Sequence, residues 1–151
     1  MRKLAYTLAA AAALLALPRA GEAQDYRQTV VAQLEAASQP VVRQGFAADA
    51  SVFNRDVQIG ALAQGATSMV ELNLTAGARY FIAAACDEDC SDLDLRIFPA
   101  DNATALAEDT GEDDYPMVTF TAPTTGRYML AVDMAKCTGS VCYYGYRVFR
   151  K

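Results

Sequence analysis

Two short segments hold most of the acidic side chains, and carboxylates at this density could bind a cation. Five fall within 87–94 and five more within 108–114. Clustered carboxylates repel one another unless water or a cation lies between them, and Ca²⁺ takes about six to eight oxygen ligands from such loops. The candidate calcium ligands are Asp87, Asp89, Asp92, Asp94, Asp109, Asp113 and Asp114. A solvated acidic rim that keeps the protein soluble is the other interpretation, and the sequence leaves both open.

The four cysteines, Cys86, Cys90, Cys137 and Cys142, form two close pairs along the chain. An even number of cysteines in an exported protein is typical of disulfides. Both spacings fall where loops are expected, so we predict bonds between Cys86 and Cys90 and between Cys137 and Cys142. Their spacing is also compatible with a tetrathiolate zinc site, which an oxidising compartment disfavours.

Most catalytic schemes lack their residues in this chain. It has no histidine, which excludes Ser-His and Cys-His nucleophiles, and no glycine-rich phosphate loop. Three tyrosines follow the last cysteine, and alternation turns Tyr144 and Tyr146 toward the core. Tyr143 is then the candidate for contact with a sugar ring or a peptide.

The first 23 residues have the pattern of an export signal. Arg2 and Lys3 precede an apolar run over residues 8–17, and small residues at Gly21 and Ala23 fit cleavage after residue 23. Ten residues of helix span about 15 Å, half of the roughly 30 Å hydrocarbon core of a bilayer. We therefore expect removal of residues 1–23, no stable membrane anchor afterwards, and a periplasmic or secreted protein.

The chain that remains after cleavage is acidic. Loss of three basic residues and one acidic residue leaves 10 basic and 17 acidic side chains and a formal charge of −7. An acidic balance argues against nucleic acid as a partner, because nucleic-acid affinity depends on neutralised phosphates. The remaining length is typical of one domain.

Residues 24–50 are expected to form an N-terminal helical segment or linker. Val30 and Leu34 recur at helical spacing, Asp25 is the expected N-cap, and Pro40 is expected to end or kink the helix. This segment either packs beside the following domain or binds a partner.

Residues 51–151 are predicted to form an all-β domain. Apolar and polar residues alternate with a period of two, as at Leu93, Leu95 and Ile97, which is typical of strands with one buried face. Short strands separated by turn residues favour an antiparallel β-sandwich. We expect about eight strands, at 56–63, 67–74, 79–85, 92–98, 104–108, 117–122, 127–134 and 142–149.

Alternating strand direction brings separate loops together. If successive strands are antiparallel, the loops near 86–91, 109–115 and 135–141 lie at one end of the sandwich. Both acidic segments and both cysteine pairs would then share that end.

Three motifs connect this domain with a known family. They are Ala76-Gly77-Ala78-Arg79-Tyr80, Asp92-Leu93-Asp94-Leu95, and Thr125-Gly126-Arg127-Tyr128 with Pro123 before it. In order and spacing, the stretch 70–149 resembles the bacterial pre-peptidase C-terminal domain, a jelly-roll-like β-sandwich appended to many secreted peptidases. The resemblance implies a non-catalytic domain, which in some relatives binds calcium or an extracellular polymer such as collagen.

Three functional hypotheses follow. The first is a secreted or periplasmic non-catalytic binding module whose partner is an extracellular or envelope protein or polysaccharide, with calcium ordering the acidic rim. The second is a structural, envelope-associated protein with no discrete small ligand. The third is a small hydrolase that uses a pair of carboxylates, as glycosidases do.

Overall fold

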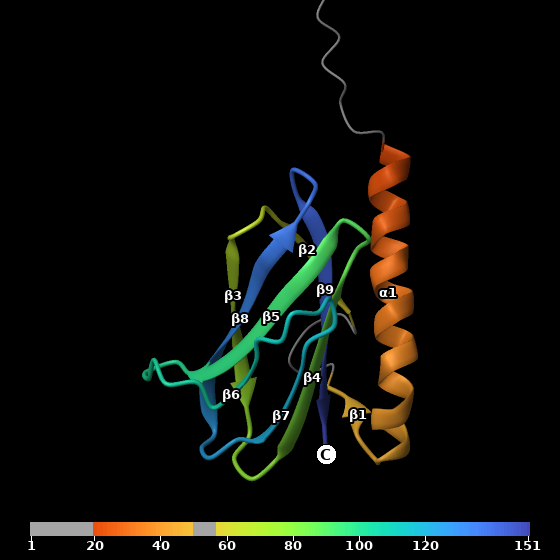
Figure 1. The fold of residues 1–151 in the computed structure, drawn as a ribbon. Coiled ribbons are helices and arrows are strands. Elements are labelled where there is room, and N and C mark those ends of the chain that lie inside the picture. Colours follow the sequence, from red (N-terminus) through yellow and green to blue (C-terminus); the bar gives the residue numbers. More distant parts are fainter. Residues whose placement is uncertain (1–19, 50–56) are drawn as a thin grey trace, which may run out of the picture.

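The computed structural model describes residues 20–49 and 57–151, which form a β-sandwich with one helix against its side (Figure 1). Most of the predicted export signal, residues 1–19, lies outside the described residues. The elements, in chain order, are α1 (Ala20–Arg43), β1 (Ala47–Ala48), β2 (Gln58–Leu62), β3 (Thr67–Leu74), β4 (Arg79–Cys86), β5 (Cys90–Pro99), β6 (Ala107–Asp109), β7 (Met117–Thr121), β8 (Gly126–Cys137) and β9 (Cys142–Arg150).

The strands form two antiparallel sheets. Sheet A has the order β1-β9-β4-β7, with β2 also paired to β9, and sheet B has the order β3-β8-β5-β6. The predicted antiparallel sandwich is thereby confirmed, and a strand is present at each of the eight expected positions. Strand β1, two residues long, is additional.

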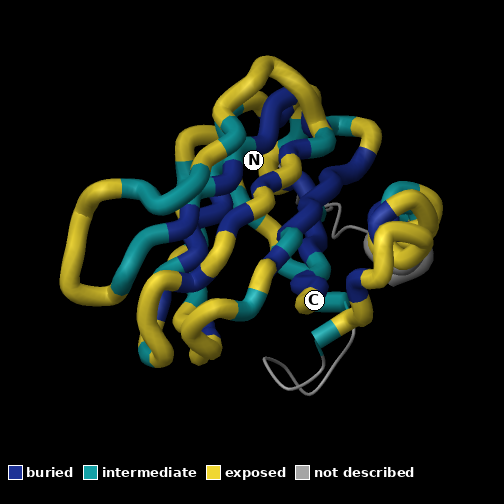
Figure 2. Tube along the Cα trace, turned by 90° about the horizontal axis from the view of Figure 1, so that it is seen from below, coloured by how far each residue is buried: buried dark blue, intermediate teal, exposed yellow. Residues whose placement is uncertain are grey.

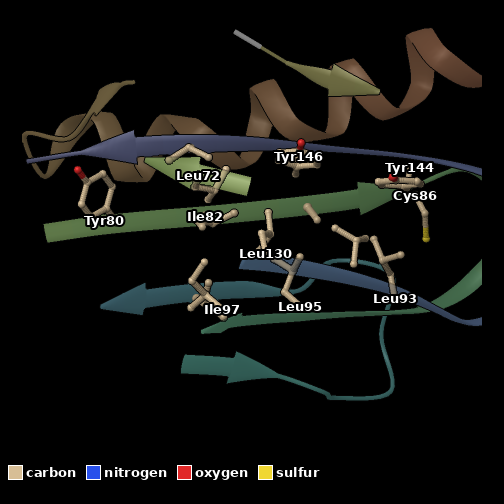
Figure 3. Close-up of a cluster of buried hydrophobic side chains, with 14 of the residues drawn as sticks. Leu72, Tyr80, Ile82, Cys86, Leu93, Leu95, Ile97, Leu130, Tyr144 and Tyr146 are labelled. Carbon is tan, nitrogen blue, oxygen red and sulfur yellow. The ribbon is translucent and has the colours of Figure 1, made fainter. Parts of the chain in front are cut away.

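The core lies between the two sheets. Side chains from alternate positions of β4, β5 and β8 meet there, among them Ile82, Leu95 and Leu130, all fully buried (Figure 3). Tyr144 and Tyr146 point into this core from β9, as alternation predicted, and each is 5% exposed. Figure 2 shows the buried positions concentrated in the strands, with the connecting loops exposed.

Helix α1 packs on the outer face of sheet A. Its buried side chains Val30 and Leu34 contact Ala83 and Ala85 of β4, and all four are 0% exposed. On β9, Gly145 provides the space for this contact, because a Cβ atom there would lie 2.8 Å from Val30 Cγ1. Small residues of the sheet therefore allow the close approach of the helix at Val30 and Leu34.

The helix is longer than predicted at its N-terminal end. It begins at Ala20, so Asp25 is not its N-cap but lies within it, where the Asp25 carbonyl accepts a hydrogen bond from Thr29 Oγ1 (3.2 Å). The Ala, Glu and Gln residues among 20–24 have high helix propensity, which allows the helix to start earlier. Pro40 lies inside the last turn of the helix, which ends at Arg43. Val41 in the same turn is buried.

Candidate functional site

Three loops from different parts of the chain meet at one end of the sandwich, as predicted. The β8–β9 loop contacts the β4–β5 loop through Thr138, whose N–H donates to the Asp89 carbonyl (2.8 Å). The β6–β7 loop joins them at Asp113, whose carbonyl accepts from Leu93 N (2.9 Å). We call the segments 87–94, 108–116 and 135–142 the acidic end.

Two disulfides brace the acidic end. Cys86 on β4 bonds to Cys90 on β5, and Cys137 on β8 bonds to Cys142 on β9, which confirms the predicted pairing. Each bond links a strand of sheet A to a strand of sheet B. Cys90 and Cys137 are also direct neighbours in sheet B. The two sheets are therefore tied together twice at this end.

Two of the candidate calcium ligands are buried. Asp87 is 2% exposed, and its Oδ2 accepts a hydrogen bond from Tyr143 N (2.7 Å), while its Oδ1 has no hydrogen-bond partner. Burial raises the pKa of Asp87 above its ordinary value, and the nearby Asp89 adds to the rise. Asp92 is 6% exposed and lies 3.4 Å from Lys136 Nζ.

The remaining candidates contact the backbone or face solvent in different directions. Asp109 accepts from Gly111 N (3.3 Å) and Met117 N (2.9 Å), and Asp113 Oδ1 accepts from Tyr115 N (2.9 Å). These bonds order the β6–β7 loop. The last three candidates lie apart: Asp94 on the outer face of sheet B, Asp89 half-buried in the β4–β5 loop, and Asp114 exposed.

These side chains do not fit a calcium site. Within residues 20–49 and 57–151, no group of three or more His, Cys, Asp or Glu side chains is arranged to hold a metal ion. Asp87, Asp109 and Asp113 accept hydrogen bonds from backbone N–H groups, and Asp92 and Glu112 contact Lys136. The structure thus gives no support to the expected calcium, and we derive no role for a metal.

Lys136 on β8 is a residue of the acidic end that the sequence reasoning missed. Its ammonium group lies 2.9 Å from Glu112 Oε2 and 3.4 Å from Asp92 Oδ2, and so bridges two of the three segments. Both carboxylates raise the pKa of Lys136, and Lys136 lowers the pKa of Glu112. The only signal in the sequence is that Lys136 is the single basic residue among ten carboxylates in the three segments.

The ring of Tyr143 lies against α1. It stacks on Tyr26, with centroids 6.0 Å apart and planes inclined by 15°, and the Arg27 guanidinium carbon lies 5.7 Å from its centroid. Contact with this helix half-buries the residue predicted to meet a ligand. Tyr26 and Arg27 could not be linked to Tyr143 from the sequence, because more than a hundred residues separate them.

A hollow of about 320 Å³ lies where α1 passes the β4–β5 loop. It is lined by Asp25, Tyr26, Thr29 and Glu88. Two of its walls are carboxylates and one is an aromatic ring, a combination suited to an organic cation. No motif in the sequence marked these four residues as a group.

Comparison with known proteins relates the chain to solved structures of low sequence identity. No family model matches the chain, and a search of curated proteins returned no match. The periplasmic inhibitor of g-type lysozyme, PliG, from Aeromonas hydrophila is 14% identical, with a TM-score of 0.49, over 63% of this chain and 84% of that one. PliG from Salmonella Typhimurium is 12% identical, with a TM-score of 0.42, over 63% and 89%.

The family named from the sequence is also among these structures. The pre-peptidase C-terminal domain of Bacillus anthracis collagenase is 19% identical, with a TM-score of 0.49, over 61% of this chain and 86% of that one. At these identities and TM-scores, no ligand or activity is carried over to this chain. In the described part of the chain, every helix is too short or too polar to cross a membrane.

Proposed function

We propose that this protein is an exported, non-catalytic binding module whose acidic end binds a partner protein with a basic surface. The observation that carries the proposal is the acidic end itself, where ten carboxylates and one lysine lie in three segments that two disulfides brace. Complementary charge speeds the encounter of two proteins and selects between partners.

The rigidity of the acidic end supports binding. Ordering flexible loops upon association costs free energy, and a surface that is already ordered avoids part of that cost. Here the loops are tied to one another by Thr138 and Asp113, and to the sheets by disulfides. Export is supported by the same disulfides, which persist in oxidising compartments, and by the signal-like pattern at residues 1–23.

The environment of the acids supports a role other than catalysis. A glycosidase-type acid combines a raised pKa with access to substrate. Asp87 has a raised pKa but is 2% exposed, so a substrate cannot reach its carboxyl group. Asp94 has a raised pKa and is accessible, but it lies on the outer face of a sheet, directly opposite Asp133 in the register.

A binding measurement tests the proposal. Polylysine serves as a probe of charge, and a g-type lysozyme, the enzyme class that the two PliG proteins inhibit, serves as a folded probe. We expect the double variant Asp113→Asn/Asp114→Asn to bind polylysine at least about threefold more weakly at low salt, which corresponds to roughly 0.7 kcal/mol. Both positions are exposed, and the amide at 113 can still accept the hydrogen bond from Tyr115 N.

A matched control removes the same charge elsewhere. Glu35 lies on the exposed side of α1 and Asp101 in the β5–β6 loop, so Glu35→Gln/Asp101→Asn changes the net charge equally without touching the acidic end. Equal loss of binding in both double variants would show a general charge effect and would contradict the proposal. If the protein inhibits the g-type lysozyme and only the acidic-end double variant inhibits it less, the proposal extends to a folded partner.

A further inference from the structure

The hollow between α1 and the β4–β5 loop is set beside the acidic end. Figure 1 shows this loop beside the N-terminal half of α1, and Glu88 comes from the loop while Asp25, Tyr26 and Thr29 come from the helix. The hollow exists because two elements that are distant in sequence meet here. Its chemistry therefore belongs to the tertiary structure and not to either segment alone.

The charges that line the hollow are available to a ligand. Neither the Asp25 carboxylate nor the Glu88 carboxylate has an ion-pair partner among the described residues, and both residues are exposed. The nearest basic side chain of the helix, Arg27, instead lies over the Tyr143 ring and lines a different hollow, on the outer side of α1. Two carboxylates without an ion pair among the described residues therefore border the space.

The aromatic wall is fixed in place. Tyr26 is stacked on Tyr143, and Tyr143 is held at its backbone by reciprocal hydrogen bonds with Asp87 of 2.7 and 2.9 Å. Asp87 is in turn next to the Cys86–Cys90 disulfide. Within the stacked pair, Arg27 lies over the Tyr143 ring, whereas the Tyr26 ring lines the hollow.

We propose that this hollow receives one lysine or arginine side chain of the partner protein, a proposal that rests on the function proposed above. The two carboxylates would contact the charged head, and the Tyr26 ring would cover the apolar stem, as amphipathic side chains require. A space of about 320 Å³ with two carboxylates is too large and too poor in ligands for a metal ion, in keeping with the lack of a metal-binding group in the part of the chain described.

The test is an amide-resolved NMR titration of the full chain. The probe is Nα-acetyl-lysine methylamide, and the matched probe is Nα-acetyl-norleucine methylamide, which has the same stem without the charge. We expect saturable shifts at the amides of Thr29 and Glu88 for the lysine probe, with a Kd on the order of millimolar. Glu88→Gln should weaken this binding about threefold to fivefold, and Glu88→Gln/Asp25→Asn about tenfold or more.

Glu35→Gln is the matched control, since it removes the same charge from the outer side of the same helix and should change the Kd less than about twofold. Equal binding of the two probes, shifts located elsewhere, or a Kd unchanged by Glu88→Gln would each overturn the proposal. The acidic-end double variant at Asp113 and Asp114 could bind polylysine more weakly than its control while the lysine probe does not bind in the hollow. That result would refute the proposed lysine site and leave the proposed function standing. Binding of the lysine probe in the hollow, with equal polylysine binding by the two double variants, would refute the proposed function of the acidic end.

Discussion

The two outer faces of the sandwich differ in what covers them. On sheet A, α1 covers the outer face, and Ala83 and Ala85 of β4 are 0% exposed. On sheet B, no described element covers the outer face, and Met69 of β3 is 51% exposed (Figure 1). Strand alternation decides which side chains point outward, whereas a covering element decides whether those side chains are buried.

The two outer faces also differ in the side chains that they carry. Beneath Val30 and Leu34 the covered face carries small residues, Ala83, Ala85 and Gly145, so the helix can come close there. The open face carries ion pairs instead, between Arg96 and Asp133 (2.7 Å) and between Arg127 and Glu71. Burial of such pairs under a helix would remove water from charged groups at a cost.

The largest expected difference between the faces comes from truncating an apolar side chain on each. Leu34→Ala should lower the free energy of unfolding by about 3 kcal/mol, because Leu34 is fully buried between α1 and sheet A. Met69→Ala on the open face should change it by less than about 0.5 kcal/mol. Urea denaturation followed by tyrosine fluorescence measures both free energies of unfolding. A loss for Leu34→Ala as small as that for Met69→Ala would mean that α1 contributes little to the fold.

A smaller effect is expected from adding one methyl group under the helix. Gly145→Ala would place a Cβ atom 2.8 Å from Val30 Cγ1 and 3.0 Å from the Gln58 carbonyl oxygen, and should cost about 1–3 kcal/mol. Gly126→Ala in β8 is the control, since nothing lies within 4 Å of its added Cβ. The comparison of thermal unfolding midpoints decides the point: if both variants melt like the unaltered protein, the helix does not rest on β9 as described.

The smallest expected effect concerns charge on the open face. Burial, followed by repulsion from Asp92 and Asp133, raises the pKa of Asp94 above its ordinary value of 3.8. The folded protein therefore holds this proton more tightly than the unfolded chain, and the contribution of Asp94 to stability falls as pH rises through the interval from 3.8 to the raised pKa. Asp94→Asn should stabilise the protein at pH 7 by about 0.5 kcal/mol, and the gain should disappear below pH 3.8.

The matching control for Asp94→Asn lies on the same face. Glu71→Gln removes a carboxylate that pairs with Arg127 (3.3 Å), so it should produce a slight loss of stability at pH 7 instead of a gain. Urea midpoints at pH 7 and at pH 3 measure both variants. The same sign of change for the two substitutions would contradict the origin that we assign to the Asp94 effect.

The strands and the disulfides were predictable, whereas the helix contacts were not. Alternation located β3, β5 and β8 closely, because it follows from backbone geometry within each strand. Strand β4 departs from simple alternation, since α1 buries its outer residues as well, and its unbroken apolar run over residues 80–86 was the available signal. The expected N-cap at Asp25 was wrong because residues 20–24 continue the helix.

The candidate site was predictable in its position and not in its chemistry. Antiparallel order alone placed both acidic segments and both cysteine pairs at one end, and the contacts of Thr138 and Asp113 confirm it. The calcium hypothesis assumed that neighbouring carboxylates converge. Among the described residues no group of three or more is arranged to hold a metal ion, and Asp87, Asp109 and Asp113 each accept a hydrogen bond from a backbone N–H.

By itself, then, the sequence determined where the strands lie, which side of each strand faces the core, and which cysteines pair. These properties depend on backbone geometry and short separations along the chain, which the order of residues encodes directly. Only the tertiary structure decided that α1 covers sheet A, that Tyr26 stacks on Tyr143, and that Lys136 bridges two acidic segments. Such contacts join residues far apart in the chain, and their distances depend on how whole sheets and a helix pack together.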